Sequence, residues 1–301
     1  MADLDPFVPA ADWAGRGFAF LRCLAFLLLT TILIFGLSFA SSWLTRRLAA
    51  LGVDIPAVST LPIGIAEEGI SAFAATALLA RIGGRRLRDF GWAKRDRWRN
   101  FLLGIATGNV ILALLIFALA GLSAVSLVEG VTAGTAAFYG AAYAAFMLGV
   151  GFAEEGGFRG YALVTLAQSV SFWPAALLIS ALFSLAHGFN GGETPAGLAS
   201  IGLFSMVLAY SYRRTGSLWF ACGLHGGWDF AQTFVFGVPN SGLVLPGALL
   251  QPQFHGPAWL TGGSDGPEGS ILLPVALALA VFAVEAMVRR RPPIAATLGP
   301  G

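Results

Sequence analysis

Long apolar segments constrain this chain more than any other feature of its sequence. About 20 consecutive apolar residues are enough for a helix to cross the hydrocarbon core of a bilayer. Of the 301 residues, 56% are hydrophobic and only 11% are charged, whereas about 25% of residues are charged in an average soluble domain. This composition excludes an ordinary soluble protein and a disordered chain. We therefore expect an all-α, polytopic membrane helical bundle in which residues 1–301 form a single transmembrane domain.

Eight segments are predicted to span the membrane. They lie near residues 20–43, 57–81, 101–124, 133–166, 172–189, 196–213, 217–236 and 270–288. The fourth is longer than one crossing needs, so it must tilt, protrude or kink, and Gly156-Gly157 is the expected weak point. The Gly- and Pro-rich stretch 237–269 is predicted to be a long loop on the non-cytoplasmic side.

Clusters of basic residues set the expected orientation, because cytoplasmic loops carry an excess of Lys and Arg. With eight crossings, the clusters after the second, sixth and eighth segments fall on one side, and only Arg46-Arg47 disagrees. We expect this side and both termini to be cytoplasmic. Lys94 is the one Lys among 18 basic residues, a bias toward Arg that favours a bacterial chain and hence a bacterial inner membrane. The net charge of +2 is too small to indicate a nucleic-acid partner.

Ionisable side chains within the apolar segments are the candidates for function, since a charge in the bilayer centre is costly. Glu155 and Arg159 are four residues apart, so they can form an ion pair on one helix face. Glu154 then points about 100° away and stays available for chemistry. His225 and Asp229 have the same four-residue spacing, which allows the carboxylate to orient the imidazole ring.

Other polar residues in these segments favour structural roles. Glu67-Glu68 repeats the Glu-Glu pair without the Arg, so we expect a supporting role, with lining of a cavity as the alternative. Glu285 lies one turn before Arg289 and is expected to pair with it. Cys23 and Cys222 both lie in apolar runs and are expected to act as small apolar side chains.

The predicted turns bring the candidate residues together. If residues 169–172 form a turn, Glu154 lies about 16 residues before it and His187 about 16 residues after it, at the same depth in antiparallel helices. A second turn near residues 214–216 places His225 and Asp229 at a comparable depth, roughly 15–21 Å beyond it. We therefore expect Glu154, His187, His225 and Asp229 to share one polar cavity inside the membrane.

This set of side chains suits hydrolysis by either of two mechanisms. In one, Glu154 is the general base that activates water with His187, while His225 and Asp229 stabilise the oxyanion. In the other, Glu154, His187 and His225 hold zinc, whose bound water is the nucleophile. The chain contains no His-Glu-x-x-His motif. The residues alone leave both mechanisms open.

The three motifs Glu-Glu-x-x-x-Arg, Phe-x-x-x-His and His-x-x-x-Asp/Asn, in this order, resemble those of the CPBP intramembrane protease family. This family includes the type II CAAX prenyl endopeptidases and Abi-like bacterial relatives linked to bacteriocin immunity. The matching residues are Glu154, Glu155, Arg159, Phe183, His187, His225 and Asp229, in a core of about 140–232. Residues 87–92 are similar to a stretch often found before that core. Asp229 stands where Asn is also common.

The resemblance implies a membrane endopeptidase that cleaves a membrane-associated or lipidated peptide. It assigns water activation to Glu154 with His187, oxyanion stabilisation to His225 with Asp229, and supporting roles to Glu155, Arg159 and Phe183. Family members include both metalloproteases and metal-independent glutamate proteases, so zinc stays open, and the oligomeric state is not indicated.

Two other functions are compatible with the same residues. A non-catalytic membrane scaffold or bacteriocin-immunity protein would keep the site as a binding pocket and would tolerate loss of Glu154. A proton-coupled transporter would use Glu154, His187 and Asp229 as a relay. The transporter is disfavoured because the sequence shows no repeated halves of the kind that many transporters have.

Overall fold

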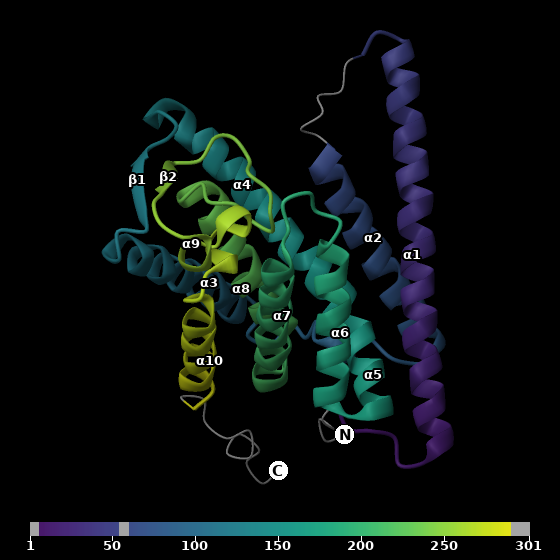
Figure 1. Cartoon of the computed structure of the whole chain (residues 1–301). Coiled ribbons are helices and arrows are strands. Elements are labelled where there is room, and N and C mark those ends of the chain that lie inside the picture. Colours follow the sequence, from purple (N-terminus) through teal and green to yellow (C-terminus); the bar gives the residue numbers. More distant parts are fainter. Residues whose placement is uncertain (1–5, 54–59, 290–301) are drawn as a thin grey trace.

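The computed structural model describes the chain except for residues 1–5, 54–59 and 290–301 (Figure 1). Its α-helices are α1 (Trp13–Ala50), α2 (Thr60–Ile82), α3 (Arg97–Gly121), α4 (Ala133–Glu154), α5 (Leu163–Val170), α6 (Phe172–His187), α7 (Pro195–Thr215), α8 (Leu218–Phe230), α9 (Ala258–Thr261) and α10 (Leu273–Arg289). Short 3₁₀- or π-helical elements are η2 (Leu87–Phe90), η3 (Glu155–Ala162), η4 (Ala231–Val235) and η5 (Gly263–Gly269). Two strands, β1 (Val125–Glu129) and β2 (Leu250–Phe254), complete the described chain.

The expected all-α membrane bundle is confirmed. Within the described residues, six helical stretches are long and apolar enough to cross a membrane, at 13–50, 60–82, 97–121, 133–170, 195–215 and 263–288. The predicted fifth and seventh segments are also helical but shorter, because α6 has 16 residues and α8 has 13. The expected eight full crossings therefore become six long helices and two short ones.

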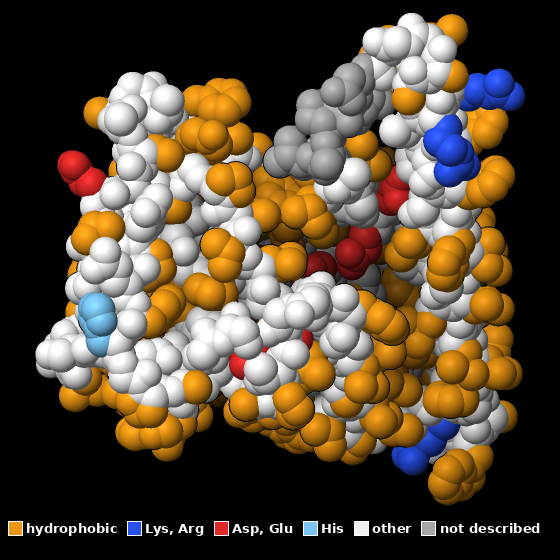
Figure 2. All heavy atoms as spheres, turned by 45° about the horizontal axis from the view of Figure 1, so that its top comes forward, with side chains coloured by type: hydrophobic (Ala, Val, Ile, Leu, Met, Phe, Trp, Pro, Cys, Tyr) orange, Lys and Arg blue, Asp and Glu red, His pale blue; other side chains and the backbone are white. Residues whose placement is uncertain are grey.

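Large apolar side chains cover the outside of the bundle. Phe35 and Phe39 on α1 are 71% and 70% exposed, and Phe282 on α10 is 71% exposed. Hydrophobic side chains dominate the outer surface in the space-filling view (Figure 2). Since water would make such exposure unfavourable, this surface fits an integral membrane protein surrounded by lipid.

The helices form two groups on either side of α7 (Figure 1). On one side, α1 packs against α2 and α5, with α6 beside them. On the other side lie α3, α8 and α10, and α4 links the groups by contacting both α2 and α8. Helix α1 begins and α10 ends at the same end of the bundle, as an even number of crossings would place them.

Glycine lets α8 pack backbone to backbone in the interior. A Cβ atom on Gly223 would collide with the Phe101 carbonyl of α3, and one on Gly226 would lie 2.7 Å from the Met147 carbonyl of α4. Glycine at such positions permits close approach between membrane helices. As a result, α8 is held between α3 and α4, and its polar residues face the centre of the bundle.

The long fourth segment departs from regular geometry where it passes the site. Helix α4 continues into the π-helical η3, in which Gly160 has the non-helical angles φ −68° and ψ −106°. The break expected at Gly156-Gly157 therefore lies one turn later. Gly156 instead packs closely, since its Cβ position is 3.4 Å from the Phe73 ring and 3.5 Å from the Trp92 ring. Single π-helical turns are frequent at functional sites.

The stretch 237–269 was expected to be a loop, but it contains ordered elements. Strand β2 pairs antiparallel with β1, with Leu127 opposite Pro252, and α9 and η5 follow. The pairing joins segments more than a hundred residues apart, and Pro252 weakens the local strand pattern. Such long-range pairing is not visible in local sequence. We call residues 237–269 the cap, because several of them cover the cavity described below.

Candidate active site

A cavity of about 430 Å³ is lined by all four residues predicted to be catalytic, Glu154, His187, His225 and Asp229. Its walls come from α2, α4, α6, α7, α8 and the cap. The space-filling view shows acidic side chains inside a hollow that faces the viewer (Figure 2). The expected convergence of these residues in one cavity is therefore present in the structure.

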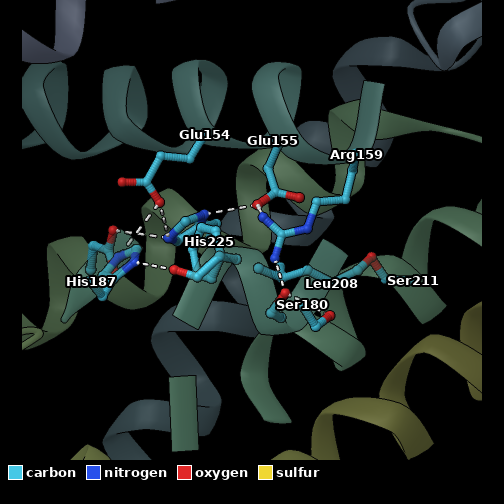
Figure 3. A network of polar contacts seen from close by, with 11 residues as sticks. Glu154, Glu155, Arg159, Ser180, His187, Leu208, Ser211 and His225 are labelled. Atoms are coloured by element: carbon cyan, nitrogen blue, oxygen red, sulfur yellow. Dashed lines mark hydrogen bonds and ion pairs between the residues drawn. The ribbon is translucent and has the colours of Figure 1, made fainter. Parts of the chain in front are cut away.

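Glu154 is the last residue of α4 and faces the two histidines (Figure 3). Its Oε2 lies 3.7 Å from His225 Nε2 and 4.0 Å from His187 Nε2. This oxygen is buried and accepts no hydrogen bond from the part of the chain that the structure describes. It is therefore available to accept a proton from a small molecule in the cavity.

His187 is oriented by its own helix. Its Nδ1 lies 2.9 Å from the Phe183 carbonyl oxygen, and the Phe183 ring centroid lies 4.5 Å from that of the imidazole. Because a carbonyl only accepts, Nδ1 must be the donor. In the neutral ring, Nε2 then carries a lone pair that faces Glu154 across the 4.0 Å gap.

His225 lies among three carboxylates. Its Nδ1 is 3.0 Å from Glu155 Oε1, and its Nε2 is 3.5 Å from Asp229 Oδ2 and 3.7 Å from Glu154 Oε2. The sequence predicted that Asp229 orients this ring. In the structure, Glu155 makes the closer contact at Nδ1, and Asp229 faces the opposite nitrogen.

Glu155 is part of a buried polar network behind the site (Figure 3). The expected ion pair is present, with Arg159 Nη1 donating to Glu155 Oε1 at 2.9 Å, and both side chains are fully buried. Arg159 also donates to Ser205, whose hydroxyl donates to Ser180 at 2.8 Å. The Arg159 guanidinium lies 4.2 Å from the centre of the Phe183 ring. This network connects η3 to α6 and α7 and holds the Glu155 carboxylate against His225.

The second Glu-Glu pair is divided between two environments. Glu67 accepts a hydrogen bond from Ser38 on α1, whereas Glu68 lines the cavity together with Glu154. The alternative of a cavity-lining role thus applies to Glu68. Glu285 accepts hydrogen bonds from Tyr210 and from Arg214 Nε, the latter at 2.5 Å. The side chain of its predicted partner, Arg289, lies outside the described residues.

The cap supplies residues that sequence reasoning missed. Asn240 and Glu268 both line the cavity. The Asn240 amide donates to Thr233 Oγ1 at 3.1 Å, and Glu268 accepts from the Ser241 backbone N–H at 2.8 Å. A buried Glu in a Gly- and Pro-rich stretch gives no periodic signal. The available sequence signal was the position of Glu268, an acidic residue directly before the apolar segment 270–288.

Further carboxylates lie behind Glu268. Asp265 accepts from the Thr194 backbone N–H at 2.8 Å, at the beginning of α7. Glu193 precedes that helix, and burial, followed by the nearby charges of Glu268 and Asp265, raises its pKa to about 8. Acidic groups thus extend from the cavity wall to the junction of the cap and α7.

Glu154 lies farther from His187 and from His225 than two ligands of one zinc ion lie from each other. Two ligands at about 2.1 Å from one tetrahedral zinc ion are about 3.4 Å apart. Glu154 Oε2 is 3.7 and 4.0 Å from the two histidine nitrogens. Among the described residues, no three His, Cys, Asp or Glu side chains are arranged to hold a metal ion.

Comparison with known proteins supports the resemblance seen in the sequence. Residues 136–231 match the family model of the Rce1-like type II CAAX prenyl endopeptidases. This region holds every motif residue of the predicted core. No curated protein and no solved structure gives a significant match. The match associates the core with an intramembrane peptidase family.

Proposed function

We propose that this protein is an intramembrane endopeptidase that hydrolyses a peptide bond of a membrane-associated or lipidated peptide. The observation that carries the proposal is the unpartnered, buried Glu154 Oε2 facing His187 and His225 in one cavity. The family match over residues 136–231 supports the same reaction class.

Glu154 and His187 are suited to holding the attacking water. A separation of 4.0 Å between Glu154 Oε2 and His187 Nε2 is too long for a direct hydrogen bond and leaves room for a bridging water. Both atoms are acceptors when His187 is neutral, so the water donates one hydrogen to each. Its oxygen lone pair then points away from both, toward a bound carbonyl. Glu154 takes the proton as the C–O bond forms.

His225 is suited to stabilising the oxyanion. As an imidazolium its ring carries an N–H on each nitrogen, and Glu155, Glu154 and Asp229 surround it. With Nδ1 donating to Glu155, the second N–H at Nε2 is directed into the cavity and can donate to the tetrahedral oxygen. Asp229 supports this proton and does not itself donate while ionised. Glu154 then delivers its proton to the leaving amine.

We also propose that the protein resides in a bacterial inner membrane with both termini in the cytoplasm. The arginine clusters support this orientation. In a bacterial membrane, a peptide pheromone, a bacteriocin or the tail of a membrane protein fits the proposed substrate class better than a prenylated CAAX protein does.

The proposal is tested by comparing peptide termini in membranes of source cells that carry wild type, Glu154→Ala or Glu67→Ala. Glu67→Ala is the matched control, since it removes the same side chain from the other Glu-Glu pair. We expect new termini in wild type and Glu67→Ala that are lost in Glu154→Ala at equal protein abundance.

Identical termini in all three strains, at equal abundance, would contradict the peptidase and support a scaffold. If uptake of a solute driven by a pH gradient depended on Glu154, while the set of peptide termini did not, a proton-coupled transporter would replace the peptidase as the function.

A further inference from the structure

Most of the ionisable groups that line the cavity are acidic. Four carboxylates line it, Glu68, Glu154, Asp229 and Glu268, together with two histidines. No Lys or Arg is among its described lining residues. In the described part of the chain, the arginine ion pairs use Asp89, Asp96, Glu155 and Glu285. His225 lies 3.7 Å from Glu154 and 3.5 Å from Asp229, whereas no ion pair in that part of the chain joins Glu68 or Glu268 to a basic residue.

Two of the four carboxylates have no step in the proposed reaction. Glu154 activates water and Asp229 faces His225, but Glu68 and Glu268 are left over. Both line the same cavity as Glu154, His187 and His225. The two spare carboxylates come from α2 and the cap, so different elements bring them to the cavity wall.

A partly enclosed cavity with more carboxyl groups than basic groups in its wall has a negative potential. A cation that enters the cavity relieves the mutual repulsion of the carboxylates, whereas an acidic group adds to it. Electrostatic complementarity of this kind gives specificity, because a like charge is rejected. The rest of the lining is largely apolar and gives no comparable preference.

We infer that the cavity selects peptides with a basic side chain next to the scissile bond, and that Glu68 and Glu268 bind that side chain. The inference rests on the proposed peptidase function and names the class of substrate for it. An extended peptide advances about 3.3–3.6 Å per residue, so carboxylates in the wall of the cavity that Glu154 lines can contact the residues adjacent to the cut.

The test uses purified full-length protein in liposomes and palmitoylated, internally quenched decapeptides of Ala, Leu and Ser. One position at a time carries Arg, Gln or Glu. The ratio of kcat/KM for the Arg peptide to that for the Gln peptide is measured for wild type, Glu68→Gln, Glu268→Gln and the double variant. Glu129→Gln is the control, because it makes the same change on an exposed residue of β1.

We expect wild type and Glu129→Gln to favour Arg over Gln by about tenfold at one or more positions, and to cleave the Glu peptide least. Each single variant should lower the Arg-to-Gln ratio, and the double variant should bring it close to one. Using a ratio cancels any general loss of activity or folded protein.

An equal or lower rate for the Arg peptide in wild type, or an unchanged ratio in the double variant, would overturn the inference while leaving the peptidase function intact. If wild type cleaves no peptide faster than Glu154→Gln does, the proposed function fails as well. The two failures are therefore distinguishable.

Discussion

The same dipeptide, Glu-Glu, occurs on α2 and at the end of α4, with different consequences in the two places. In each pair, one carboxyl group faces the cavity and the other faces a neighbouring helix. Glu155 meets Arg159 and His225, whereas its counterpart Glu67 meets the hydroxyl of Ser38. The role of each pair therefore depends on the partners that other helices supply.

The cavity-facing residues of the two pairs, Glu154 and Glu68, also differ in their partners. Glu154 faces two imidazole rings within 4.0 Å. Glu68 lines the same cavity, but no hydrogen bond or ion pair joins it to a histidine in the described chain. A carboxylate with nearby imidazoles can exchange protons with water, whereas an isolated one contributes mainly charge.

Glu154→Gln should lower kcat by about 10²–10⁴-fold, because the amide keeps the shape of the side chain but cannot accept a proton. The rate is measured on purified protein with any peptide cleaved by wild type. The Glu67→Gln variant, with the same chemical change, serves as control. Equal losses in both variants would show that the two pairs do not differ in function.

Arg159→Met should destabilise the fold by about 3–5 kcal/mol, because it leaves the fully buried Glu155 carboxylate without its cation. The free energy of unfolding is measured in mixed micelles by titration with a denaturing detergent. Arg99→Met, at an exposed position of α3, is the matched control and should change little. If Arg159→Met were as stable as Arg99→Met, the buried network would have no structural role.

Glu67→Gln should change stability by no more than about 1 kcal/mol, since the amide oxygen can still accept from Ser38. The same detergent titration measures it, and kcat is followed in parallel. A large loss of activity in this variant would assign catalytic importance to the α2 pair and would remove the contrast with α4.

Chelation should have the smallest effect. The distances from Glu154 to the two histidines exceed those of ligands that share one zinc ion, so we expect cleavage to persist after dialysis against a strong chelator. Metal content is measured in the same samples by mass spectrometry. Loss of activity that added zinc restores would instead assign zinc to Glu154, His187 and His225.

Local sequence was sufficient for much of the fold and for the predicted convergence. The turns expected at 169–172 and 214–216 lie at the ends of α5 and α7, where Ser171 and Gly216 have positive φ. The chain reverses at each of these turns, and Glu154, His187 and His225 line one cavity. Helical periodicity likewise predicted the Glu155–Arg159 ion pair, because four residues make about one turn.

The sequence also carries a signal for the close packing of α3 against α8, namely the spacing of their glycines. Gly104 and Gly108 on α3 have small-xxx-small spacing, as do Gly223 and Gly227 on α8, and these surfaces meet. The spacing marks a face that allows close approach but does not identify the partner helix. Which glycine-bearing faces pair was decided by the tertiary structure.

What the sequence by itself determined is the membrane class, the helices and the candidate catalytic residues, since apolar length, residue type and helical spacing are local properties. Only the tertiary structure decided that Glu155, rather than Asp229, contacts His225 Nδ1, and that the cap brings Glu268 to the cavity. Both contacts join residues far apart in the chain. Their geometry depends on how α3, α4 and α8 pack and on the pairing of β1 with β2, which no local pattern encodes.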